Sequence, residues 1–169
     1  MSEKTSKEYF VAQVIQYQDS LYRMAKALVK DEDFAKDILQ DLYVKLWVKR
    51  EHLVGVIHFH AYMMRALRNL CLDNLKKNRW IMEDVDDHLE SGTENPHALL
   101  ERKDFNMMIS KLIEQLPELQ RTVLHLKDVE GLDVKEIAYI SDLTENAVRV
   151  NLCRARQRLR EMIQGSKNK

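Results

Sequence analysis

The chain contains few of the residues that make turns or covalent cross-links: its 169 residues include 4 Gly, 2 Pro and 2 Cys. Folds built from many short strands need Gly and Pro at their turns, so this scarcity favours helices. Cys71 and Cys153 lie far apart, within helical patterns and without metal-ligand spacing. We therefore expect reduced thiols, no disulfide framework and no metal site.

Long hydrophobic runs are missing as well. The N-terminal MSEKTSKEYF is polar and lacks the apolar core of a signal peptide. No apolar run approaches the roughly 20 residues that a helix needs to cross a membrane. The sequence also has no Ser/His/Asp set, paired-carboxylate site or phosphate-cradling Gly loop. We therefore expect a cytoplasmic protein that inserts in no membrane, catalyses no covalent step and uses no cofactor.

The formal net charge is +0, which by itself gives no indication of a nucleic-acid partner. The charges are unevenly distributed, however. Residues 1–80 carry 14 Lys and Arg against 10 Asp and Glu, residues 98–169 carry 13 against 11, and residues 81–97 carry 6 acidic residues and no basic ones. Because the acidic stretch has no sustained period, we interpret it as an extended linker between two domains.

Apolar residues recur at helical spacing in three stretches of the first domain, where we expect helices over residues 9–29, 34–49 and 61–79. Asp33 is placed to cap the second helix. Between the second and third, Gly55 indicates a loop. His58 and His60 in that loop could suggest a metal site. Because no third ligand is in view, we interpret the segment as a loop carrying aromatic and imidazole rings.

The second predicted helix has two different sides. Its apolar residues are expected to point one way, toward a core: Ile38, Leu42, Leu46 and Val48. Another face, which we call the acidic face, carries Asp37, Gln40 and Asp41. Acidic and amide side chains on one face of a helix often have no role beyond solvation, so this alternative stays open from composition alone.

The third predicted helix carries a stripe of mixed chemistry, with spacings of three, four, four and three residues: Tyr62, Arg65, Asn69, Asp73 and Lys76. Phe59 lies just upstream. Aromatic rings can stack on unpaired bases, amides can bond to base edges, and cations can follow the phosphates. We call this set the aromatic-basic stripe. An ordinary surface stripe on a helix bundle is the alternative.

Helical periodicity resumes after the linker, and a further helix is expected to start near Pro117. Asp133 precedes an apolar-periodic run and Glu136 follows three residues later, the pattern of a capping box. The run breaks at Ser141-Asp142, where Asp tolerates a left-handed turn, and Thr144 can cap the next helix. That last helix has one apolar stripe: Val148, Leu152, Ala155, Leu159 and Met162.

The opposite side of the last helix is rich in arginine and polar residues, from Asn146 to Gln157. A short helix, a tight turn and a longer basic helix is the layout of a helix-turn-helix, which places its second helix in the major groove. Arginines there can also contact phosphates, which makes affinity depend on salt. A solvated amphipathic helix without a DNA role is the alternative.

Together these segments resemble the ECF-type sigma factors of bacterial RNA polymerase, from about residue 17 to residue 162. DILQDLYVKLW followed by AYMMRALRNLCLDNLKKNRW resembles sigma region 2. LPELQRTVLHLKDVEGLDVKEIAYISDLTENAVRVNLCRAR resembles sigma region 4. The resemblance implies an all-α protein of two small helical domains: region 2 over residues 1–80, the acidic linker over 81–97, and region 4 over 98–169.

The resemblance also implies partners and a role for each surface. The acidic face matches the surface that docks on core RNA polymerase. The aromatic-basic stripe matches the part that captures flipped bases of the minus-ten element: Phe59, Tyr62, Arg65, Asn69 and Lys76. Further cations there are candidates for backbone contacts: Arg68, Lys77 and Arg79. A set that we call the reading face matches the surface that reads the minus-thirty-five element: Asn146, Arg149, Val150, Cys153 and Arg154. Arg121 lies where a phosphate contact is often found, and an anti-sigma partner is expected.

The sequence departs from the family pattern in three places. The turn before the recognition helix usually carries a Gly and here is Ser141-Asp142, AVRVNLCRAR stands in place of the common TVKSRLHRAR, and Tyr62 stands where Trp is common. Val150 and Cys153 replace more polar residues, which leaves the identity of the minus-thirty-five sequence open. The alternatives to a sigma factor are a stand-alone helix-turn-helix regulator, a helical adaptor without a DNA role, and a metalloenzyme using His58 and His60.

Overall fold

The computed structural model describes residues 3–82 and 100–167, and within these ranges every regular element is a helix. The first group comprises α1 (Glu3–Val29), α2 (Glu32–Val48), α3 (Arg50–Leu53) and α4 (Phe59–Met82). The second comprises α5 (Leu100–Glu114), α6 (Glu118–Leu124), the wider turn η1 (His125–Val129), α7 (Val134–Ser141) and α8 (Glu145–Lys167). The predicted all-α fold is confirmed. No described helix is long and apolar enough to span a membrane.

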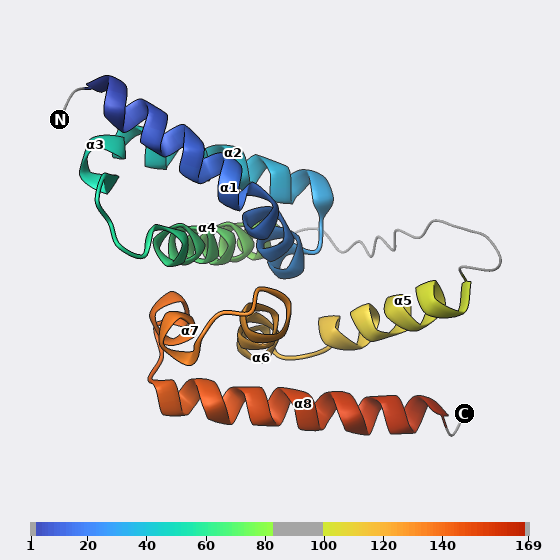
Figure 1. The fold of residues 1–169 in the computed structure, drawn as a ribbon. Coiled ribbons are helices and arrows are strands. Elements are labelled where there is room, and N and C mark those ends of the chain that lie inside the picture. The colour runs from blue at the N-terminus through green and yellow to red at the C-terminus, as the bar shows by residue number, and fades with distance from the viewer. Residues whose placement is uncertain (1–2, 83–99, 168–169) are drawn as a thin grey trace.

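The first group is a bundle in which α1, α2 and α4 pack against one another (Figure 1). Its core is formed by large apolar side chains from all three helices, among them Leu21, Ile38, Leu42, Met63 and Leu67. Burying each of these side chains contributes about 1.5–3 kcal/mol, so the bundle rests on this core rather than on helix propensity. The predicted helical period of this region is therefore confirmed.

The helix boundaries differ from the sequence-based ones in physically understandable ways. Asp31, not Asp33, caps α2: its carboxylate accepts the Phe34 N–H at 2.8 Å, and Asp33 lies inside the first turn. The predicted ring-bearing loop is partly helical, since it contains α3 and since α4 begins early enough to include His60. Helix α4 also runs into the start of the predicted linker, whose residues 83–97 lie outside the described part of the chain.

The second group places the two helix-turn-helix elements, α7 and α8, around α6. Val148, Leu152 and Ala155 on the predicted apolar stripe of α8 are buried. Leu159 and Met162, further along that stripe, are partly buried and pack with Ile113, Leu116 and Leu124. The stripe predicted for the last helix is thus confirmed, and it fixes which side of α8 faces outward.

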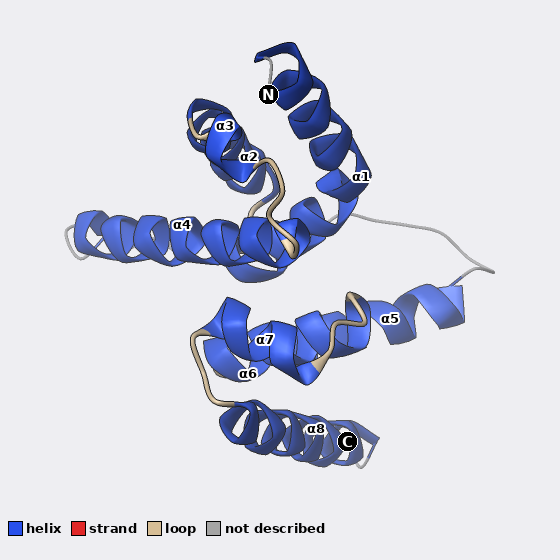
Figure 2. Cartoon of the chain, turned by 60° about the vertical axis from the view of Figure 1, so that its left-hand side comes forward, coloured by secondary structure: helices blue, strands red, loops and turns tan. Residues whose placement is uncertain are grey.

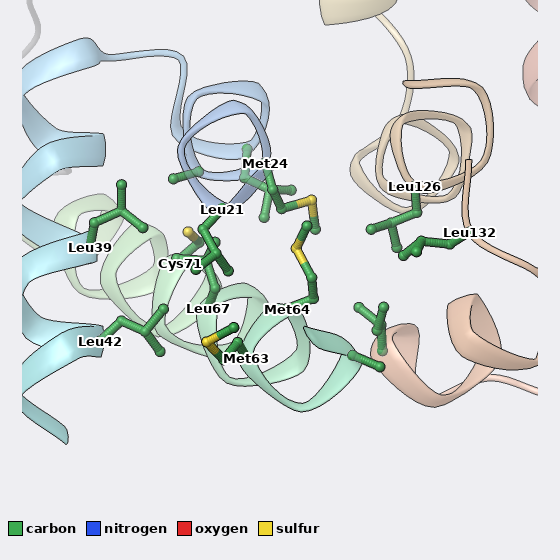
Figure 3. Close-up of a cluster of buried hydrophobic side chains, with 14 of the residues drawn as sticks. Leu21, Met24, Leu39, Leu42, Met63, Met64, Leu67, Cys71, Leu126 and Leu132 are labelled. Atoms are coloured by element: carbon green, nitrogen blue, oxygen red, sulfur yellow. The ribbon is translucent and has the colours of Figure 1, made fainter. Parts of the chain in front are cut away.

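The two groups are packed together. Helices α6 and α7 lie between α8 and the first bundle (Figure 2), and α7 packs along α4 while α6 and η1 meet α1. Buried side chains of both groups belong to one continuous apolar cluster. In Figure 3, Met24 and Met64 of the first bundle lie toward Leu126 of the second group. This packing leaves α8 at the outer edge of the molecule.

Candidate nucleic-acid interface

The residues of the reading face lie together on the outward side of α8. Asn146, Arg149, Cys153 and Arg154 are exposed, and Val150 is 38% exposed. These side chains share a face because the apolar stripe on the other side is buried against α6 and α5. A basic helix with one buried and one open side has the geometry needed to enter a groove of duplex DNA.

The entry into this helix is set by three local contacts that the sequence predicted. The Asp133 carboxylate accepts the Glu136 N–H at 2.8 Å, and the Glu136 carboxylate accepts the Asp133 N–H at 3.1 Å, which completes a capping box. Asp142 adopts a left-handed backbone with φ 57° and ψ 48° in the turn. Thr144 Oγ1 then accepts the Ala147 N–H at 3.2 Å at the start of α8. These features begin α7, turn the chain after it and begin α8.

Two arginines of α8 are oriented by nearby carboxylates. Arg156 donates to both carboxylate oxygens of Asp128, at 2.6 and 3.3 Å, and this pairing raises the pKa of Arg156. Arg149 donates to Glu145 at 3.0 Å, one turn away on the same helix. Such exposed pairs add little stability, but they limit the directions in which the guanidinium groups can point.

Arg121 lies apart from the reading face. It is 8% exposed, it donates to the Glu114 backbone oxygen at 3.2 Å, and burial lowers its pKa. In this arrangement of the chain the guanidinium is covered, and the phosphate contact of Arg121 stays a prediction. The cause of this burial is tertiary: α1 packs against α6, and Arg121 reaches back to Glu114 at the C-terminal end of α5.

The two cysteines occupy different environments. Cys71 is fully buried in the first bundle, and burial raises the pKa of its thiol to about 12, which keeps it protonated and unreactive. Cys153 is exposed on the reading face. Neither is in a disulfide, and no group of three or more His, Cys, Asp or Glu side chains that could hold a metal occurs among the described residues.

The acidic face of α2 is open to solvent: Asp37, Gln40 and Asp41 are all exposed. Two apolar side chains extend it, since Val44 is 63% and Val48 is 73% exposed. The prediction that Val48 points to the core is wrong, because α2 ends at Val48 and its last turn passes the edge of the bundle. Carboxylates, an amide and two valines therefore form one exposed surface on α2.

The aromatic-basic stripe is only partly open. Asn69 and Lys76 are exposed on α4, as is Lys77 beside them, whereas Tyr62 and Arg65 are half-buried. The Arg65 guanidinium lies 4.7 Å from the centre of the Tyr139 ring and donates to Asp142 at 3.3 Å. Arg68 is also half-buried, and the side chain of Arg79 lies outside the described part of the chain.

Phe59 does not belong to the open stripe. Its ring is 3% exposed and packs between the rings of Tyr9 and Tyr62, at centroid distances of 5.9 and 6.5 Å. The expectation that Phe59 itself meets a base conflicts with this burial. The apolar ring fills the core at the start of α4 and positions Tyr62, a role that sequence spacing could not separate from an exposed one.

His60, considered for a metal site, instead faces α1. Its ring stacks on Tyr17 at a centroid distance of 4.3 Å, and its Nε2 lies 3.1 Å from Ser20 Oγ. Burial lowers the pKa of His60, although Glu130 and Glu136 act in the opposite direction. His60 is therefore packed against α1 within the first group of helices, near enough to Glu130 and Glu136 of the second group to feel their charge.

Comparison with known families gives two matches, in the order along the chain that the sequence suggested. Residues 14–81 match Sigma-70 region 2, and residues 106–159 match Sigma-70, region 4. The RNA polymerase sigma-H factor of Pseudomonas aeruginosa is 25% identical over 173 residues, which cover 96% of this chain and 90% of that protein. The ECF RNA polymerase sigma-E factor of Escherichia coli is 26% identical with the same coverage.

Two solved structures share the fold. The sigma factor RpoE of Bartonella quintana, in complex with the anti-sigma factor NepR, matches with a TM-score of 0.78 and 24% identity, over 93% of this chain and 98% of that one. CnrH in complex with the cytosolic domain of CnrY matches with a TM-score of 0.69 and 19% identity, over 94% and 90% of the two chains. At these identities the likeness concerns the fold alone.

Proposed function

The chain belongs to the sigma-70 family, in its ECF group of RNA polymerase sigma factors, and we propose that three separate surfaces carry out its part in transcription initiation. The observation that supports this division is the outward exposure of the acidic face and of the reading face on opposite groups of helices. The protein supplies recognition and strand capture to core polymerase and performs no covalent chemistry of its own. Its place of action is the cytoplasm.

The reading face is proposed to hold the minus-thirty-five duplex. Asn146 and Arg149 lie in the first turns of α8, and the N-terminal residues of a recognition helix are the ones that reach base edges. Arg154 lies further along the helix, where phosphates pass. Val150 offers an apolar contact of the kind that suits a thymine methyl group. Affinity should therefore be salt-dependent, with sequence preference concentrated at a few base pairs.

The aromatic-basic stripe is proposed to bind the minus-ten strand after it separates. Tyr62 supplies a ring for stacking, Asn69 supplies an amide for a base edge, and Lys76 and Lys77 supply charge near the backbone. Extruding a base costs a few kcal/mol, and stacking returns about 1–3 kcal/mol per base. Phe59 contributes from behind, by supporting the Tyr62 ring.

The acidic face is proposed to dock on core RNA polymerase, with Val44 and Val48 as its apolar part. Carboxylates accelerate encounter with a basic partner surface, while buried valines prolong the complex once it forms. Asp37 and Asp41 are placed on adjacent turns of α2, so both carboxylates point to the same side.

Run-off transcription with core polymerase and genomic fragments from the same organism tests this function. The wild-type chain should start RNA chains at a limited set of sites. Asp37→Lys combined with Asp41→Lys should abolish retention on core polymerase, whereas Glu51→Lys, an exposed reversal on α3, should not. Arg154→Ala should weaken duplex binding and lower the salt slope by about 0.9 for each phosphate that the side chain no longer neutralises. If the folded wild-type chain with core polymerase starts RNA chains at no site, the proposed function is disproved.

We also propose an anti-sigma partner for this chain. The Bartonella quintana structure described above holds a sigma factor with an anti-sigma factor, and this chain shares its fold over nearly the whole length. A protein seated across both domains would cover the polymerase-docking and strand-binding surfaces together. Its chemistry should be complementary to the acidic face, with basic and apolar side chains facing Asp37, Gln40 and Val44.

A further inference from the structure

A buried carboxylate connects the two groups of helices. Glu130 follows η1, its side chain is 3% exposed, and it is bound by two side chains of α1. Arg23 donates to it from Nε at 3.0 Å and from Nη2 at 2.8 Å, and the Ser20 hydroxyl donates at 2.7 Å. From its own domain, His125 Nε2 lies 3.2 Å away.

The network extends from Glu130 into α4. Ser20 has a single hydroxyl proton, which it gives to Glu130, so its oxygen accepts from Nε2–H of His60 at 3.1 Å. His60 is held in turn by its stacking on Tyr17. Burial alone would raise the pKa of Glu130, but the bonds from Arg23 and Ser20 outweigh it and lower the pKa. The carboxylate is therefore charged, and side chains of both groups of helices surround it.

A second set of contacts covers the aromatic-basic stripe. Tyr139 and Asp142, at the end of α7, occupy the guanidinium of Arg65. Tyr62 faces the same helix across a cavity of about 600 Å³ that Tyr139 and Glu136 also line. In this arrangement α7 occupies the guanidinium of Arg65 and faces the Tyr62 ring across the cavity, so an unpaired DNA strand cannot contact both side chains without meeting α7.

We propose that Glu130 locks the two domains in a closed state in which α7 occupies the strand-binding surface around Tyr62 and Arg65. The acidic face and the reading face stay exposed in this state, so the lock restricts strand capture and leaves polymerase docking and duplex binding possible. Removing one partner while the carboxylate stays buried is costly, so the bonds to Glu130 add to the apolar contacts that hold the two groups together. The proposal rests on the function assigned above to the aromatic-basic stripe.

Glu130→Gln tests the lock with little change in size. We expect the variant to expand, measured as a larger radius of gyration by small-angle X-ray scattering, and to exchange amide hydrogens faster across residues 134–141. We expect the apparent Kd for a labelled single-stranded DNA pool of random sequence to fall about tenfold. This is the change expected if the wild-type protein is closed about nine-tenths of the time and the variant is open. Affinity for random duplex DNA should stay unchanged.

Arg23→Gln, made on the other side of the interface, should reproduce the effect, and the double variant should be no more open than either single one. Glu118→Gln is the matched control, because Glu118 is an exposed acid of the same domain. Circular dichroism verifies that each variant keeps its helices.

The outcomes separate the lock from the function on which it rests. Expansion with tighter single-strand binding supports both. Expansion and faster exchange without a gain in single-strand affinity would leave the lock in place and overturn the role of the stripe. Unchanged scattering and unchanged exchange in both Glu130→Gln and Arg23→Gln, with the fold intact, would overturn the lock.

Discussion

At the scale of single residues, burial decides what each ionisable side chain does. Asp37 and Asp41 are solvated and available to a partner, whereas Glu130, chemically similar, is enclosed by Arg23, Ser20 and His125. Two aromatic side chains only three positions apart differ in the same way, since Phe59 is core and Tyr62 reaches the surface. The sequence gives the chemistry of each side chain, and its exposure decides whether another molecule or the protein itself contacts it.

The two interface histidines predict how closure depends on pH. Burial lowers the pKa of His60 and of His125 from the ordinary value of 6.5. At His60, the charges of Glu130 and Glu136 oppose this lowering. At His125, Glu130 opposes the lowering and the charge of Arg23 adds to it. The closed state therefore binds fewer protons than an open state with solvated rings, so acidification through 6.5 favours opening. The pKa of Glu130 is lowered in the closed state. Protonation of its carboxylate therefore weakens the closed state further only at pH values below the ordinary pKa range of a glutamate.

We expect the radius of gyration to increase between about pH 7.5 and about pH 5.5, and to do so reversibly. Replacing both rings, with His60→Gln and His125→Gln, should remove most of that change. His52→Gln, an exposed histidine on α3, should leave it intact. A scattering profile that is independent of pH over this range would contradict the assignment.

At the scale of elements, the helix-turn-helix depends on how α7 begins and ends. The capping box at Asp133 satisfies two orphan N–H groups, and the left-handed Asp142 turns the chain toward α8. Asp142 has a second role, since it also binds Arg65 of α4. The turn residue that departs from the family's usual Gly thus contributes a side chain to the contact between domains.

Asp133→Ala should lower the free energy of unfolding by about 1 kcal/mol, because the cap is lost and the Glu136 N–H has no replacement acceptor. Asp133→Ser should restore most of that stability, since its hydroxyl can accept the same bond. Urea unfolding followed by circular dichroism measures both. Equal stability of the Ala and Ser variants would show that capping is not the source of the effect.

At the scale of the whole molecule, the apolar cluster joins the domains into one folding unit in the closed state. Leu126 is fully buried and faces Met24 and Met64 of the first bundle (Figure 3). Removing it would create a cavity at the contact between domains rather than inside one of them. The substitution should therefore lower the coupling free energy between the two domains more than it lowers the free energy of unfolding of either domain alone.

Leu126→Ala should cost about 2–5 kcal/mol and broaden or split the urea transition, because the domains then unfold less cooperatively. Leu39→Ala is the control: it lies on α2 at the far side of the first bundle and should cost a similar amount while leaving one sharp transition (Figure 3). Tryptophan fluorescence and circular dichroism should diverge for Leu126→Ala alone. Coincident transitions in both variants would contradict the coupling.

The sequence by itself determined the helical class, the apolar stripe of α8, the capping box, the left-handed turn at Asp142 and the family, because each depends on short-range spacing. It could not place Phe59, Arg121 or Val48, whose exposure depends on which elements cover them. The tertiary structure alone revealed Glu130 and its α1 partners, because Ser20 and Glu130 are separated by 110 positions and no local pattern links them. Contacts between domains depend on how two finished surfaces meet, and periodicity within a helix carries no information about that meeting.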